Sequence, residues 1–166
     1  SVAGKTRQGD YALAIGPLAG NIDQGVKSVA IGSECGRTSQ GTLSIAMGAY
    51  SASNDQGLYA VALGHKSGQE TQGEKSIGVG HYAGNDNQLQ RAVAIGTQAG
   101  QTAQQADGVG VGYEAGQDTQ GTRAVAVGAG AAKEDQGGSA VAIGYHAADL
   151  EQGASAIAIG NSAGQK

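Results

Sequence analysis

A glycine recurs every sixteen residues along this chain, ten times without an insertion or a deletion, and a glutamine recurs ten times with the same period. A fixed period of this length indicates a repeat protein in which each unit is one turn of a stack, and it constrains the fold more than any local motif does. The glycines are Gly16, Gly32, Gly48, Gly64, Gly80, Gly96, Gly112, Gly128, Gly144 and Gly160, and the glutamines are Gln8, Gln24, Gln40, Gln56, Gln72, Gln88, Gln104, Gln120, Gln136 and Gln152.

Two aliphatic residues precede each periodic glycine, separated by a single Ala or Gly. Strict alternation of mostly β-branched residues indicates a strand, and sixteen residues are too few for two helices and a turn. The first aliphatic column is Leu13, Val29, Ile45, Val61, Ile77, Val93, Val109, Val125, Val141 and Ile157, and the second is Ile15, Ile31, Met47, Leu63, Val79, Ile95, Val111, Val127, Ile143 and Ile159.

Each unit therefore reads as one rung: a short strand, a glycine corner, a second extended segment and a Gln-Gly corner. Ten stacked rungs predict an all-β fold, a parallel β-solenoid or β-roll, with strands about 4.8 Å apart in a rod about 45–50 Å long. We expect residues 1–166 to form a single repeat domain. Because solenoids need atypical capping repeats and neither end has one, we expect a fragment of a longer fibrous protein.

The composition predicts a thin interior. The chain has 31 glycines, six tyrosines as its only aromatic residues, and neither Phe nor Trp, although aromatic side chains supply much of the buried area of most cores. We favour the aliphatic columns inside; the alternative places them outside, along an axis of association, with the small residues of the same strand inside. In the favoured arrangement they face a small column on the opposite wall, Ala19, Cys35, Ser51, Ser67, Ala83, Ala99, Ala115, Ala131, Ala147 and Ala163.

The glutamine column is interpreted as structural. A buried glutamine on every rung can donate and accept along an amide ladder and can satisfy the backbone of the following turn. The members that we expect in this ladder include Gln24, Gln56, Gln88, Gln120 and Gln152.

Composition and motifs exclude several function classes. The net charge of −4 is spread evenly, which gives no basic surface for nucleic acid, and no apolar run is long enough for membrane insertion or a signal peptide. The string Gly78-Val79-Gly80 resembles part of a nucleotide-binding fingerprint but belongs to the repeat. His65 and His81 share a column and could form a metal pair, but exposed turn residues explain them better. We expect no enzyme, no catalytic residues, no cofactor and no metal.

The tyrosines are the residues that the fold does not require. Tyrosine buries area while keeping a hydrogen-bonding group, which favours it at recognition surfaces. The positions just after the corner glycine are therefore our candidates for surface recognition, and they are Tyr50, Tyr82, Tyr113, Tyr145, His65 and His81, with Lys66 and His146 beside them.

Several strings carry a resemblance to a known family. Ser28–Gly32, Ala92–Gly96 and Ala140–Gly144, with a following Ala-Gly as at Ala99-Gly100, resemble the head repeats of trimeric autotransporter adhesins, the YadA-like head. Similar repeats occur in fibre proteins of bacteriophages and large viruses. The resemblance covers the whole chain. It implies a left-handed parallel β-roll with three chains side by side around one axis.

The resemblance and the rod together lead to a functional hypothesis. We expect a structural and adhesive fibre segment, extracellular, on a bacterial cell surface or a virion, that presents a rigid rod for attachment to a host surface. The expected partners are two further copies in a homotrimer and a host-surface glycan or protein. The alternatives are an ice-binding β-solenoid, which would use a flat regular face, and a self-assembling filament or matrix protein, since uncapped roll ends can stack.

Overall fold

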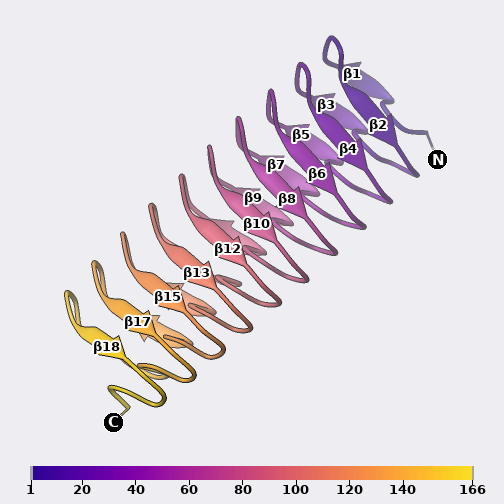
Figure 1. Cartoon of the computed structure of the whole chain (residues 1–166). Coiled ribbons are helices and arrows are strands. Elements are labelled where there is room, and N and C mark those ends of the chain that lie inside the picture. Colours follow the sequence, from indigo (N-terminus) through magenta and orange to yellow (C-terminus); the bar gives the residue numbers. More distant parts are fainter. Residues whose placement is uncertain (1, 166) are drawn as a thin grey trace.

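The chain forms a straight stack of rungs with its two ends at opposite ends of the rod (Figure 1). The computed structural model describes residues 2–165, and within that range every regular element is a short strand. All strand pairs are parallel and join residues sixteen apart, as in the pairing of Ile77 with Val93 and of Val79 with Ile95. The expected all-β parallel solenoid of sixteen-residue rungs is confirmed.

One wall of the stack is a ten-stranded sheet that carries the two aliphatic columns. Each strand is three residues long and ends at a corner glycine. Its strands are β2 (Leu13–Ile15), β4 (Val29–Ile31), β6 (Ile45–Met47), β8 (Val61–Leu63), β10 (Ile77–Val79), β12 (Val93–Ile95), β13 (Val109–Val111), β15 (Val125–Val127), β17 (Val141–Ile143) and β18 (Ile157–Ile159).

The opposite wall, which we call the polar wall, carries the glutamine column. It consists of a six-stranded and a two-stranded sheet, joined through single bridges at Thr102 and extended to Gln152 by another bridge. Its strands are β1 (Thr6–Gln8), β3 (Ile22–Gln24), β5 (Thr38–Gln40), β7 (Asn54–Gln56), β9 (Glu70–Gln72), β11 (Asp86–Gln88), β14 (Asp118–Gln120) and β16 (Glu134–Gln136).

The favoured arrangement of the aliphatic columns is wrong: they face outward. Ala94, between the two aliphatic residues of β12, is fully buried, whereas Ile95 is 40 % exposed. No member of either aliphatic column is buried along the described chain. The reason is width, because a Cβ added at Gly78 would lie only 2.7 Å from Ser67 Oγ and 3.0 Å from the Ala83 carbonyl oxygen. The middle position of the strand can hold at most a methyl group, so alternation directs the larger side chains outward.

The interior is built from Ala, Ser, one Cys and Gln. The small column opposite the ten-stranded sheet is inside as expected, and Ala19, Cys35 and Ala83 are each fully buried. The serines in it find carbonyl acceptors: Ser51 Oγ donates to Ala62 O at 2.9 Å and Ser67 Oγ to Ala83 O at 3.2 Å. A core of such small side chains gains little from hydrophobic burial per residue, so hydrogen bonding must carry more of the stability than in an ordinary domain.

The glutamine amides run through this interior as a continuous chain of hydrogen bonds. Gln88 Nε2 donates to Gln104 Oε1 at 3.0 Å and to the Ile77 carbonyl at 2.9 Å, while Gln88 Oε1 accepts from Gln72 Nε2 at 3.2 Å. The same pattern links one rung to the next from Gln56 to Gln152. Each amide thus joins two walls and two neighbouring rungs, which explains why no other side chain replaces it.

The corner glycines are fixed by two independent requirements. Gly16 has φ +122° and Gly80 has φ +136°, a region that L-residues with a Cβ rarely adopt. A Cβ at Gly16 would also lie 2.6 Å from the carbonyl oxygen of Gly32 in the next rung. The corner therefore needs glycine both for its backbone conformation and for the close stacking of rungs.

Other turns use non-glycine residues at positive φ, which the sequence did not reveal. Tyr11, Lys27, Leu43 and Tyr59 occupy one corner column with φ between +54° and +59°. Each such residue costs about 1–2 kcal/mol relative to the right-handed region. The conformation directs their amides along the rod: Lys27 N–H donates to Asp10 O at 2.8 Å and Leu43 N–H to Val26 O at 3.0 Å. The hydrogen bonds between rungs therefore continue through the corners.

Residues 2–165 contain no helix with the length and apolar character that a membrane span requires.

Removing one amide from the ladder should destabilise the rod strongly. Gln88→Ala would remove three hydrogen bonds, those that Gln88 donates to the Ile77 carbonyl and to Gln104 Oε1 and the one that it accepts from Gln72 Nε2. It would also open a cavity, and we expect a cost of about 2–5 kcal/mol in the free energy of unfolding. Urea unfolding followed by circular dichroism measures it. The control is Thr71→Ala, at an exposed position whose column already holds Ala103. Equal stability of both variants would contradict the ladder's role.

The single thiol should be protected in the folded rod. Cys35 is fully buried, and burial raises its pKa to about 12, so at about pH 8 almost none of it is thiolate. We expect iodoacetamide to leave the native protein unmodified and to alkylate Cys35 fully in concentrated guanidinium chloride, as read by intact mass. Rapid alkylation of the native protein would place this column outside the core.

Candidate interaction surfaces

The outer face of the ten-stranded sheet is a continuous apolar surface, which we call the apolar stripe. It consists of the first and second aliphatic columns, and its members are half-buried or exposed, with Leu13 at 45 %, Met47 at 41 % and Ile95 at 40 % exposure. In-register pairing places like residues above one another, as Ile45 above Val61 and Met47 above Leu63. A contiguous apolar surface of this extent is uncommon on a monomeric soluble protein and marks an interaction site.

Four of the six proposed recognition residues meet in one cluster beside the apolar stripe. The ring centroids of His65 and His81 lie 5.2 Å apart and nearly parallel, with an interplanar angle of 17°. Tyr82 packs edge-on against His81 at 4.4 Å and against His65 at 5.9 Å, and Tyr50 lies 6.2 Å from His65. Lys66 Nζ lies 5.2 Å from the Tyr82 ring centroid. We call these five residues the ring cluster.

Tyr113 and Tyr145 lie apart from the ring cluster and belong to local polar groups. Tyr113 is 53 % exposed, and its hydroxyl, together with the Lys133 ammonium, lowers the pKa of the Glu114 carboxyl. Lys133 Nζ lies 2.9 Å from Glu114 Oε2. Tyr145 packs edge-on against His146 at 4.2 Å. The structure therefore divides the recognition residues into one cluster and two single exposed tyrosines.

The five named ladder residues are inside the rod, away from any binding surface. Gln88 and Gln120 are fully buried, and Gln24, Gln56 and Gln152 are at most 8 % exposed. Gln24 Nε2 donates to the Leu13 carbonyl at 2.9 Å, the contact that the ladder members make on every later rung.

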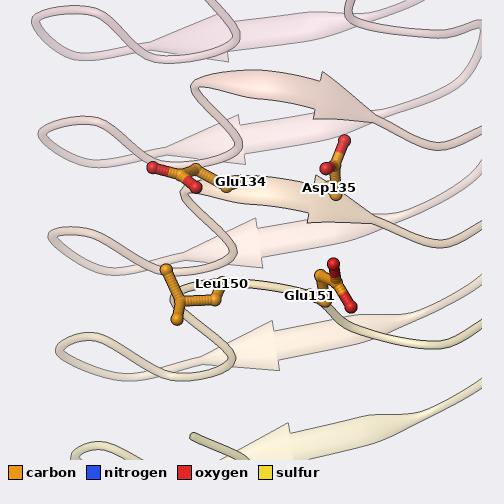
Figure 2. A pocket seen from close by; sticks show the side chains of 4 residues that line it. All are labelled: Glu134, Asp135, Leu150 and Glu151. Atoms are coloured by element: carbon orange, nitrogen blue, oxygen red, sulfur yellow. The ribbon is translucent and has the colours of Figure 1, made fainter. Parts of the chain in front are cut away.

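The outer face of the polar wall is hydrophilic and carries a shallow hollow. The hollow measures about 220 Å³ and is lined by Glu134 and Asp135 on β16 and by Leu150 and Glu151 one rung further on. Figure 2 shows Glu134 above Leu150 and Asp135 above Glu151, on successive rungs. The hollow is an open surface feature, and no group of three or more His, Cys, Asp or Glu side chains able to hold a metal ion is found between residues 2 and 165.

The apolar stripe is formed by the residues that the favoured interpretation of the sequence placed inside. A signal for its true position was present in the sequence: the residue between the two aliphatic columns is Ala or Gly in every rung, without exception. A position that is Ala or Gly in every rung is typical of a side chain that packs closely against an opposing wall, whereas a solvent-facing position on a strand tolerates larger side chains.

Comparison with known proteins identifies the repeat. Residues 39–67 match the family model described as the YadA head domain repeat, in two copies. No curated protein and no solved structure matches the chain. The resemblance to YadA-like head repeats that the sequence predicted is confirmed by this match over residues 39–67.

Proposed function

We propose that the chain is a segment of an adhesin-like surface fibre in which three copies associate through the apolar stripe. The observation that carries this proposal is the outward orientation of the two aliphatic columns along the whole described rod. The Val, Ile, Leu and Met side chains of this surface are half-buried or exposed at every rung. Burying their remaining apolar area against another chain is favourable by about 25 cal/mol per Å². A second and a third copy provide an equally long and equally regular cover.

The geometry of the rod favours parallel, side-by-side association. The apolar stripe lies on one wall and runs the length of the stack, so copies that meet along it share one axis parallel to the rod. A three-fold arrangement brings the stripes together and leaves the polar wall of each copy facing solvent. The trimer implied by the resemblance to YadA-like heads fits this arrangement, because an assembly with closed three-fold symmetry buries the apolar stripes of all three copies at once.

The proposed role of the rod is mechanical and adhesive, not catalytic. Successive rungs are joined by backbone hydrogen bonds, and the six junctions from Gln56 to Gln152 are joined also by the glutamine ladder, which gives a stiff spacer. The exposed tyrosines and the ring cluster lie at the turns that begin at the corner glycines, where they can contact a host-surface glycan or protein. We place this segment on a bacterial cell surface or a virion surface.

A charge on the apolar stripe should prevent association without unfolding the rung. Ile95→Asp places a carboxylate on an exposed position of the single chain, which costs it about 1 kcal/mol or less, but near the three-fold axis it brings three desolvated charges together. We expect light scattering coupled to gel filtration to give a trimer for the native protein and a monomer for Ile95→Asp, with unchanged circular dichroism.

The matched control for this experiment is Thr71→Asp. It adds the same charge on the polar wall, in a column that already holds Asp55 and Asp135, and should leave the trimer intact. A native protein that stays monomeric at micromolar concentration, or an Ile95→Asp variant that remains trimeric, would show that the apolar stripe is not the trimer interface.

The exposed tyrosines should contribute to attachment. Replacing Tyr113 and Tyr145 by Ala, which already occupies their column at Ala49 and Ala129, removes two amphipathic contact residues without touching the core. We expect retention of the fluorescent trimer on cultured epithelial cells to fall about fivefold or more, with unchanged mass and melting temperature. Thr119→Ala on the polar wall is the control. If the variant is retained as well as the native protein, these tyrosines do not take part in attachment. If the native protein binds none of the tested cells, the result counts against an adhesive function.

A further inference from the structure

His65 and His81 occupy equivalent positions on successive rungs, directly after the corners that follow β8 and β10. Backbone hydrogen bonds fix this register: Tyr82 N–H donates to His65 O at 3.1 Å, and Gln98 N–H donates to His81 O at 2.8 Å. Both imidazoles are exposed, and their ring centroids are 5.2 Å apart. Stacking of rungs thus holds two imidazoles side by side on a rigid backbone.

We propose that His65 and His81 form a two-imidazole site for a divalent transition-metal ion such as Zn²⁺. Zinc binds imidazole nitrogen at about 2.0–2.1 Å, and two imidazoles that bind one ion at a tetrahedral angle have ring centroids about 5 Å apart. The observed separation of 5.2 Å is of this size, but the two rings lie nearly parallel. Binding one ion therefore requires the rings to tilt toward each other about their side-chain torsions, while the backbone positions stay in place. Neutral imidazole is a preferred ligand of Zn²⁺, Cu²⁺ and Ni²⁺.

The surroundings leave both imidazoles free to bind a metal. Along the described chain neither ring takes part in a side-chain hydrogen bond or an ion pair, whereas His146 Nδ1 lies 2.9 Å from Asp149 Oδ2. Tyr50 and Tyr82 pack edge-on against the pair and restrict its rotamers. Lys66 is the charged member of the cluster, and its Nζ lies over the Tyr82 ring.

Water completes the coordination at this site. No third His, Cys, Asp or Glu joins the pair to form a larger metal-binding group within residues 2–165. An ion held by two protein ligands keeps open positions for water or for a ligand from a bound partner. Bound between two rungs, it also cross-links them through their side chains. The pair lies within one chain, so its metal binding does not depend on the proposed trimer.

The three histidines of the chain make the proposal directly testable by nuclear magnetic resonance. Addition of ZnCl₂ up to about 1 mM to the native protein should shift the imidazole resonances of His65 and His81 together, with one ion bound per chain, and should leave those of His146 in place. Unshifted resonances of His65 and His81 at that concentration would overturn the proposal, as would an equal shift of all three histidines.

Variants separate a chelating pair from weak binding by single imidazoles. His65→Ala and His81→Ala should each lower the Zn²⁺ affinity about tenfold or more by isothermal titration calorimetry, because either change leaves one ligand. Both substitutions are compatible with the fold, since Ala49 and Ala129 occupy the same column. His146→Ala, beside Tyr145 as His81 is beside Tyr82, is the matched control and should leave the affinity unchanged. Two single variants with native affinity would overturn the site.

Discussion

The buried amide of the glutamine column is the interaction on which the rest of this structure depends. It spans the interior from one wall to the other, and it sets the width of the rung because its donor has to reach the carbonyl of the first aliphatic residue on the opposite strand, as Gln88 reaches Ile77. That width leaves room for Ala, Ser and Cys but not for branched side chains. A buried amide without a hydrogen-bond partner costs about 1–3 kcal/mol in the free energy of folding. Each amide of the ladder is therefore stable only when the rungs on either side of it are folded.

A rung of this width cannot bury its own aliphatic residues. In most solenoids the apolar residues fill the coil, and each coil is a small hydrophobic core. Here the larger apolar side chains lie on the outside of one wall, and Ile95 and Met47 are exposed in the single chain. Hydrogen bonds therefore hold the coil together, and the hydrophobic burial that these side chains can still contribute is left for the association that we propose. This separation is what makes an extended fibre segment a better interpretation than a free-standing domain.

Most of the fold could be predicted from the sequence, because a period of sixteen leaves few alternatives. The rung length, the parallel register and the corner glycines follow from the columns alone. The orientation of the strand was predicted wrongly, although the Ala or Gly between the two aliphatic residues of every rung marks the inner face. The usual expectation that large apolar residues lie inside outweighed that signal, and it fails here because the interior has room only for small side chains and the glutamine amides. The left-handed turns at Lys27 and Tyr59 could not be predicted either, because these residue types have no preference for positive φ. They adopt it here because it extends the hydrogen bonding between rungs.

At the candidate surface, the shared column predicted that His65 and His81 are neighbours. The packing of Tyr82 and Tyr50 around them could not be predicted, because it depends on rotamers that a repeat pattern does not encode.

The glutamine ladder has a direction, because from Gln56 onward each Nε2 donates to the Oε1 of the following rung. Gln56 Oε1, at the start of this run, is buried without a partner. At the other end of the run, Gln152 Nε2 donates to the Val141 and Ala156 carbonyls. Each inserted rung adds one amide donor and one amide acceptor that bond to each other, so the penalty of the unpaired acceptor is shared among more rungs as the rod lengthens. Duplication or loss of a whole sixteen-residue unit conserves this balance, whereas a change of one or two residues breaks it, so such a rod can vary in length between related proteins while the rung itself stays fixed.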